Sequence, residues 1–210
     1  KVLITREIES LYTTFEPVVE VAGYLRERFN IPGMNYSEAL KVRNKHIMKT
    51  TAVENGIATA KFSLIKNLKG LYAFIRETGY PIVIKPVSGC ATSNTFKISS
   101  FGSFFNVDVI KMLWRHKEFL AEEFIDGCEY HCNSIIVNGK IVFSSVGKNL
   151  YNNMDTVLAG RPKGSIAFPA CCDNERPIGD IKSFNERLVN CYGIRDGISH
   201  AEVFVDSRGV

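Results

Sequence analysis

Apolar residues recur at helical spacing in several stretches of the chain. In residues 16–29, positions i, i+3, i+4 and i+7 are Val18, Val21, Ala22 and Leu25, which lie on one face of a helix. The same spacing predicts helices over 68–79 and 180–192. A further helix is expected from Ser37, as its N-cap, to about residue 53, before the stop signal Asn55-Gly56.

Short apolar or alternating runs predict five strands. They cover residues 81–86, 119–125, 129–137, 140–146 and 198–205. Asn138-Gly139 joins the third and fourth, and this dipeptide is a strong signal for an antiparallel hairpin. Helices combined with antiparallel strands predict an α+β fold.

The composition indicates a protein with a packed core. Of 210 residues, 45% are apolar and 23% are charged, which excludes a disordered tail, a collagen-like fibre and a small disulfide-stabilised protein. No window approaches the roughly 18–20 apolar residues of a membrane-spanning helix, and residues 1–7 do not resemble a signal peptide. We therefore expect a soluble, cytoplasmic protein with no membrane partner.

Charge and cysteine content bear on the possible partners and on the state of the cysteines. The net charge is only +4 and basic residues alternate with acidic ones, so we expect no nucleic-acid partner. Without an export signal, the six cysteines are expected to be free thiols. A zinc site from Cys128, His131, Cys132 and Cys171-Cys172 is the alternative, but the chain lacks a short C-x-x-C clamp and a matching His pair.

Both ends of the chain suggest a piece of a larger protein. A strand over Val2–Thr5, the helix 16–29 and the exit Ile31-Pro-Gly form a βα unit too small to stand alone, so residues 1–34 are expected to end a preceding α/β domain. The chain does not begin with Met. It stops at the turn-like Asp206-Ser-Arg-Gly, with no partner strand after it.

Lys85 ends the apolar strand 81–86. Because burying an unpaired ammonium costs several kcal/mol, its side chain must reach water, pair with a carboxylate or meet a ligand anion. The next loop is rich in small residues, and its free N–H groups with the hydroxyls of Ser88, Thr92 and Ser93 favour a phosphate.

Other basic residues leave alternatives open. Lys41, Lys45 and Lys49 fall four apart on the helix 37–53, so that face is either solvated or turned toward an anion. Lys148 approaches the phosphates or a substrate in one interpretation. Arg161 is either a ligand for a substrate carboxylate or a solvated side chain.

Taken in order, these pieces resemble the ATP-grasp fold over about residues 30–210. The pieces are a basic helix, a strand ending in Lys-Pro before a small-residue loop, an acidic strand followed by Asp-Gly and a hairpin, and a strand with one inward Glu. The resemblance is closest to carboxylate–amine ligases, relatives of biotin carboxylase and the amino-acid ligases. It implies antiparallel sheets with flanking helices: 35–80 as a helical first part, 81–148 as the nucleotide-binding subdomain and 149–210 as a C-terminal subdomain.

The resemblance also implies roles for individual residues. Lys45 and Lys85 would contact the phosphates of ATP, with Ser88 in the phosphate loop. The strand segment Glu122, Glu123, Phe124 and Ile125 would lie against adenine, where the main chain of Glu123 and Ile125 reads the base. Glu129 would bind the ribose and Glu202 the first Mg2+, while no catalytic side chain is assigned because positioning and charge stabilisation carry this chemistry.

The implied activity is ATP-dependent activation of a carboxylate as an acyl phosphate, which an amine then attacks. The alternative is a non-catalytic ATP-binding module, and a weaker one is another ATP-grasp chemistry such as an acyl-CoA or purine-pathway ligase. The sequence departs from the family pattern in two places: the loop 89–95 contains one glycine, and the second metal-binding Glu of the family would fall beyond Val210. We expect small-molecule carboxylate and amine partners, a homodimer as the candidate assembly, and no catalysis by this segment alone.

Overall fold

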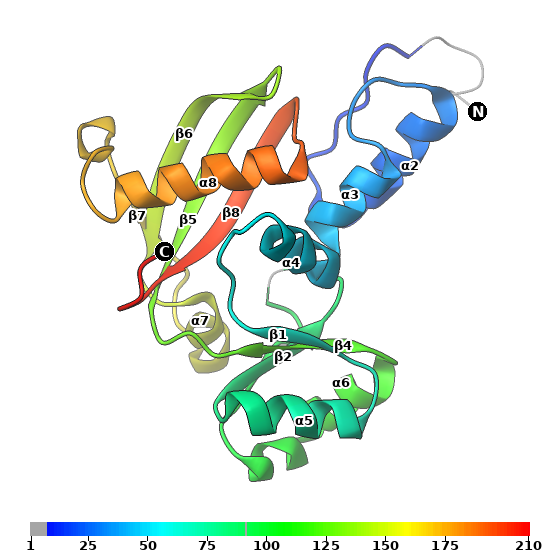
Figure 1. Cartoon of the computed structure of the whole chain (residues 1–210), viewed down its shortest axis with the longest axis vertical. Coiled ribbons are helices and arrows are strands. Elements are labelled where there is room, and N and C mark those ends of the chain that lie inside the picture. The colour runs from blue at the N-terminus through cyan, green and yellow to red at the C-terminus, as the bar shows by residue number, and fades with distance from the viewer. Residues whose placement is uncertain (1–7, 91) are drawn as a thin grey trace.

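The structure is a computed structural model that describes residues 8–90 and 92–210. The strand expected over Val2–Thr5 lies outside the described residues. The described chain folds around two four-stranded antiparallel sheets, one in the lower and one in the upper half of Figure 1. The predicted α+β class is confirmed.

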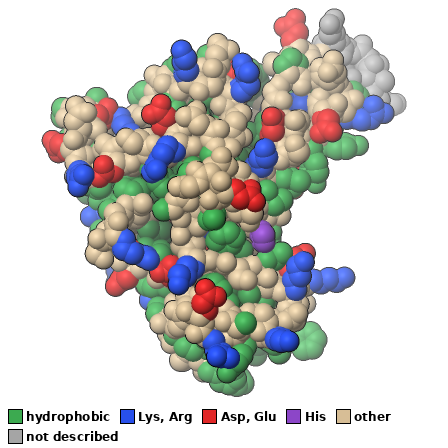
Figure 2. Space-filling view, viewed as in Figure 1, with side chains coloured by type: hydrophobic (Ala, Val, Ile, Leu, Met, Phe, Trp, Pro, Cys, Tyr) green, Lys and Arg blue, Asp and Glu red, His purple; other side chains and the backbone are tan. Residues whose placement is uncertain are grey.

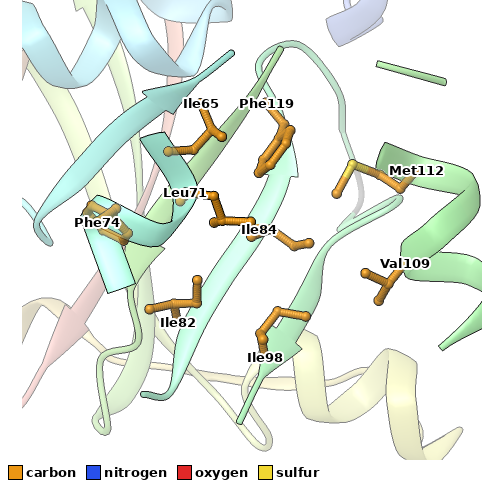
Figure 3. Close-up of a cluster of buried hydrophobic side chains, with 10 residues drawn as sticks. Ile65, Leu71, Phe74, Ile82, Ile84, Ile98, Val109, Met112 and Phe119 are labelled. Atoms are coloured by element: carbon orange, nitrogen blue, oxygen red, sulfur yellow. The ribbon is translucent and has the colours of Figure 1, made fainter. Parts of the chain in front are cut away.

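Sheet A is built from strands between residues 62 and 123. Its order is β1-β4-β2-β3, with β1 Phe62–Ile65, β2 Ile82–Pro86, β3 Phe96–Ile98 and β4 Phe119–Glu123. Helices α5 (Leu68–Thr78) and α6 (Val107–Arg115) cover one face. Apolar side chains from the strands and both helices meet there in a buried core (Figure 3), where each fully buried large side chain contributes roughly 1.5–3 kcal/mol.

Sheet B is built from strands between residues 128 and 205. Its order is β7-β6-β5-β8, with β5 Cys128–Val137, β6 Lys140–Asn149, β7 Ser165–Ala167 and β8 Gly197–Val205. Helix α8 (Ile178–Tyr192) lies across one face (Figure 1). Tyr130, Cys132, Val146 and Val203 pack against it, and because side chains alternate along a strand, the intervening residues point to the opposite face.

Several elements confirm the predictions from the sequence pattern. The hairpin between β5 and β6 turns at Asn138 and Gly139, whose φ angles of 52° and 75° are those of a left-handed two-residue turn. Helices α5 and α8 end at Gly79 and Gly193, as expected. The expected helix 16–29 is a 3-10 turn, Glu16–Val18, followed by α2 (Val19–Phe29).

The expected helix 37–53 was wrong in two respects. It is two helices, α3 (Tyr36–Arg43) and α4 (Lys45–Glu54), because Asn44 adopts an extended conformation and its Oδ1 accepts hydrogen bonds from the N–H groups of His46 and Ile47. The N-cap of α3 is Asn35 rather than Ser37, since Asn35 forms a reciprocal capping box with Glu38. Lys41 is therefore on a different helix from Lys45 and Lys49.

The sequence pattern did not predict several short elements. β1, β3 and β7 have four, three and three residues, too few for a periodicity to stand out. The 3-10 turns Phe101–Phe105 and Ala170–Cys172 and the helices α6 and α7 (Asn153–Ala159) were also missed. No helix of the described residues has the length and apolar character needed to cross a bilayer.

Charged side chains are dispersed over the visible surface. On the face drawn in Figure 2, Lys and Arg alternate with Asp and Glu and do not gather into one patch. The same view shows the surface hollowed between the upper and lower halves.

Candidate functional site

A buried carboxylate lies between two lysines on the face of sheet A opposite its core. Lys85 Nζ is 2.8 Å from Glu122 Oε2, and Lys49 Nζ is 3.5 Å from Glu122 Oε1. Lys85 pairs across the ladder with Leu120, and Val83 with Glu122, so Lys85 and Glu122 are diagonal neighbours on one face. Lys49 reaches the same carboxylate from α4, which lies over this face.

Burial and neighbouring charges shift the pKa values of Glu122 and Lys49. Burial alone would raise the pKa of Glu122, but the neighbouring charges of Lys85 and Lys49 hold it below its ordinary value. Burial lowers the pKa of Lys49, and Glu122 offsets only part of this effect. Two cations around one carboxylate leave a net positive charge at a site nearly closed to water, which is suited to an anionic ligand.

Lys45 extends the positive region toward the loop after β2. Its main-chain N–H donates to Val87 O at 2.9 Å, and its Nζ donates to Gly89 O at 2.9 Å. Burial lowers the pKa of Lys45, and the charges of Lys85 and Arg43 add to this effect. The loop holds its shape with few glycines: Thr92 and Asn94 take left-handed φ angles of 58° and 53°.

Ser88 lines a hollow of about 510 Å³ beside the beginning of α4. Asn44, His46 and Pro86 line it too, with His116 and Glu118 from the approach to β4. The resemblance assigns Ser88 to the phosphate loop, and in the structure Ser88 lines this hollow together with Asn44 and His46, the neighbours of Lys45 in the chain.

The segment that follows β4 connects the two sheets. Glu123 N–H donates to Lys61 O at 2.9 Å, so this main-chain donor is used by the sheet, and the Glu123 carboxylate meets Arg208 Nη1 at 2.9 Å. Phe124 lies with Lys97 Nζ 3.5 Å from its ring centroid, a cation–π contact. Ile125 follows in the half-buried connection to β5.

Two further carboxylates meet on sheet B, on the face away from α8. Glu129 on β5 is buried, and Glu202 on β8 is half exposed. Asn153 Nδ2 donates to Glu129 Oε1 at 2.7 Å and to Glu202 Oε1 at 2.9 Å, so the two acids share one amide. In β8, Glu202 and His200 lie opposite His131 and Asn133 of β5 and share a face of sheet B with them.

The two acids have opposite pKa shifts. Burial raises the pKa of Glu129, and the charge of Glu202 raises it further. His200, with Nε2 3.8 Å from Glu202 Oε1, lowers the pKa of Glu202, and Lys163 and Lys85 act in the same direction. The carboxylate of Glu202 is thus ionised. Its oxygens can bind a cation, and the positive groups that affect it, Lys85 and Lys163, come from both halves of the chain.

The comparisons with known proteins bear on this arrangement. No family model matches the chain. The L-arginine-specific L-amino acid ligase of Bacillus subtilis is 26% identical over 214 residues, covering 100% of this chain and 51% of that protein. The formate-dependent phosphoribosylglycinamide formyltransferase of Erythrobacter litoralis is 30% identical over 126 residues, covering 59% and 31%. The L-amino acid ligase of Bacillus licheniformis matches in structure with a TM-score of 0.78 at 22% identity, covering 100% of this chain and 48% of that one.

The chain has the ATP-grasp fold. Its two antiparallel sheets with flanking helices confirm the fold expected from the ordered motifs. It spans about half the length of the L-amino acid ligases it matches.

Mg2+ fits the residues of this ATP-grasp site. The ion is commonly held by one or two carboxylates together with the phosphates of the nucleotide, and Glu202 supplies one ionised carboxylate. Among residues 8–90 and 92–210, no three His, Cys, Asp or Glu side chains converge on one metal position. The zinc alternative at Cys128, His131 and Cys132 finds no support there.

Several residues near the site were assigned no role from the sequence. Lys49 was noted only as one of three lysines spaced four apart, and it received no role of its own. Asn153 and Lys163 lie in a stretch without periodicity, and no sequence signal pointed to them. Lys148 is paired with Tyr130, so it lies on the α8 face and not with Glu129 and Glu202. The interpretation of Lys148 as a group that approaches the phosphates or a substrate stays a prediction.

Proposed function

We propose that the chain is the nucleotide-binding part of an ATP-dependent ligase that activates a carboxylate for attack by an amine. The observation that carries the proposal is that the chain has both a cation-rich cluster on sheet A and a pair of acids on sheet B, connected by residues 124–127. A nucleoside triphosphate requires both, because cations neutralise its phosphates and carboxylates accept from the ribose hydroxyls or hold the metal ion bound to the phosphates. The names of the relatives, L-amino acid ligases among them, support the same reaction class.

In this proposal each residue of the site has one role. Adenine lies against Glu122, Glu123, Phe124 and Ile125, and the ribose hydroxyls donate to Glu129. Lys45 and Lys85 contact the phosphates, with Ser88 in the covering loop, and Lys49 holds Glu122 ionised. Mg2+ at Glu202 would neutralise charge on the phosphate oxygens.

The reaction then proceeds in two displacements. An oxygen of the substrate carboxylate attacks the γ-phosphorus of ATP, the bond to the β,γ-bridging oxygen breaks, and ADP leaves. The amine nitrogen attacks the carbonyl carbon of the acyl phosphate, which forms the amide and releases phosphate as the nitrogen loses its proton. The lysines act by placing and stabilising the phosphoryl group.

The wider organisation belongs to the proposal as well. We assign residues 1–34 to the end of a preceding α/β domain, and 35–80, 81–148 and 149–210 to successive parts of the ATP-grasp unit. Small-molecule carboxylate and amine substrates, a homodimer and a cytoplasmic location complete it. Because the chain spans about half of its relatives, turnover is expected from the longer protein.

Binding of ATP and of adenosine tests the phosphate assignment directly. Lys85→Ala should weaken ATP binding about tenfold or more, because it removes a charge-assisted contact to phosphate, but leave adenosine binding within about twofold. Lys66→Ala removes an exposed lysine outside the site and serves as the control in the same calorimetric titrations. Equal loss of ATP and adenosine affinity in Lys85→Ala would contradict the assignment.

The alternative is a non-catalytic ATP-binding module, favoured by the glycine-poor loop 89–95. The ligase releases ADP and phosphate only when a carboxylate and an amine are both present. A panel of such pairs, tested with the longer protein, separates the two functions: normal ATP binding without substrate-dependent release would support the module.

A further inference from the structure

Helix α7 begins with two asparagines that attach it to the acids of sheet B. The Nδ2 group of Asn153 donates one N–H to Glu129 Oε1 and the other to Glu202 Oε1, at 2.7 and 2.9 Å. The main-chain N–H of Asn153 donates to the second oxygen of Glu129. All three N–H groups of this residue are therefore used on two carboxylates.

Asn152 fixes the same helix to the start of β5. Its Oδ1 accepts from the N–H of Glu129 at 3.0 Å, and its Nδ2 donates to Gly127 O at 2.9 Å. Two successive residues thus clamp the strand segment that carries Glu129. Asn153 consequently has a defined position relative to β5, and only Glu202 reaches it from β8.

The bridge opposes a repulsion between like charges. Glu129 is 4% exposed, and a buried carboxylate next to another is stable only when donors satisfy its oxygens. An amide with one donor for each acid lowers that cost and also limits how far the Glu202 side chain can turn. Hydrogen bonds to charged groups are the stronger kind, so this restriction is effective.

We propose that Asn153 is a positioning residue that couples metal binding to nucleotide binding. It holds the acid assigned to the ribose and the acid assigned to Mg2+ at one spacing, so that an ion at Glu202 meets the phosphates of a nucleotide seated at Glu129. The inference rests on the proposed function. Without the bridge each acid still binds its own ligand, but the two events no longer strengthen each other to the same extent.

The test is the factor by which Mg2+ strengthens ADP binding. ADP is titrated calorimetrically into the chain with Mg2+ and with EDTA, and the ratio of the two dissociation constants is the coupling. Asn153→Ala keeps the main-chain bond to Glu129 and should lower the ratio about tenfold, with the affinity in EDTA within about twofold of the wild type. Asn153→Asp should lower it further, since it replaces the donor by a third carboxylate.

Two further variants separate coupling from folding. Asn153→Gln keeps an amide on a longer side chain and should recover part of the ratio. Asn67→Ala removes the N-cap of α5, remote from the site, and should leave the ratio unchanged. A purely structural role for Asn153 would weaken ADP binding equally with and without Mg2+.

A double-mutant cycle completes the design. In a Glu202→Gln background, Asn153→Ala should no longer change the ratio, because the metal partner of the bridge is gone. If Asn153→Ala keeps the wild-type ratio while ADP binds, the inference is overturned and the proposed function stands. If the wild-type chain binds no ADP in either condition, the proposed function fails, and the inference with it.

Discussion

The carboxylate of Glu122 balances two lysines in a place nearly closed to water. Its side chain is 9% exposed, and those of Lys49 and Lys85 are 13% and 20% exposed. Pairing is what permits three charges to be buried together, because each alone would lose most of its hydration. The strand-end position of Lys85 is thereby explained by a carboxylate partner, one of the three alternatives its sequence allowed.

Glu122→Gln should destabilise the fold by roughly 2–4 kcal/mol, since it leaves two buried ammonium groups without their counter-charge. Urea unfolding at neutral pH measures the change. Glu118→Gln, an exposed acid just before the same strand, is the matched control and should cost no more than about 0.5 kcal/mol. Similar losses in both variants would show that the pair does not stabilise the fold.

Glu122→Gln should also change how the unfolding free energy depends on pH. The lysines hold the folded-state pKa of Glu122 below its ordinary value of 4.5, so its contribution is complete above that value and is lost as the pH falls through the lower, folded pKa. The unfolding free energy of the wild type should therefore fall more steeply below pH 4.5 than that of Glu122→Gln.

Helix α4 is the element that joins the two halves of the site. It contacts sheet A through His46 and Lys49, which lie against the ring of Phe62, and it contacts α8 through Tyr192, whose hydroxyl donates to Met48 O at 3.1 Å. Burial raises the pKa of Tyr192 to about 12, so this donor is retained at physiological pH. The break at Asn44 gives α4 a direction of its own, independent of α3.

Asn44→Ala should cost about 1 kcal/mol, because two main-chain N–H groups at the start of α4 lose their acceptor. It should also weaken ATP binding, since Lys45 and Lys49 are placed by this first turn. Asn44→Asp keeps the acceptor and should retain both stability and binding. Unfolding midpoints and ATP titrations of the two variants measure these effects. Equal stability and equal ATP affinity of Asn44→Ala and Asn44→Asp would contradict the role of Asn44 as the N-cap.

The two sheets meet where the chain crosses from β4 to β5. A Cβ at Gly127 would lie 2.7 Å from Val205 O, so this crossing passes directly against the end of β8. Arg208 adds a polar link, because it contacts Asp206 on its own turn and Glu123 at the end of β4. The acids of sheet B are consequently positioned relative to the lysines of sheet A by a short, tightly packed junction.

Gly127→Ala should destabilise the protein by about 1–3 kcal/mol, because backbone atoms must move to admit the methyl group. Gly102→Ala is the control, since a Cβ there meets only Ser100 Oγ at 3.6 Å and should be nearly neutral. Nucleotide affinity should fall only in Gly127→Ala, as the junction shifts Glu129 away from sheet A. Unfolding curves and ADP titrations of both variants measure this, and unchanged values for Gly127→Ala would contradict the close packing.

Most long elements were predictable because local patterns specify them. The alternation along β5 and β8, the Asn138-Gly139 turn and the apolar stripe of α8 all depend on residues near in sequence. Ser37 and Asn35 were not separable by pattern, because both are good N-caps and only the capping box with Glu38 selects one. The three-residue strands β3 and β7 form because neighbouring strands offer hydrogen-bonding edges, which no local pattern records.

The sequence alone determined which residue types were present in which order: two lysines, an acidic strand, an Asp-Gly turn and a late inward Glu. Only the tertiary structure decided their partners. Lys85 could be matched with Glu122 once β2 and β4 were paired, and Asn153 with Glu129 and Glu202 once α7 was docked on sheet B. The physical reason is that side-chain contacts between distant residues follow from strand register and helix docking, which are set by the packing of the whole chain.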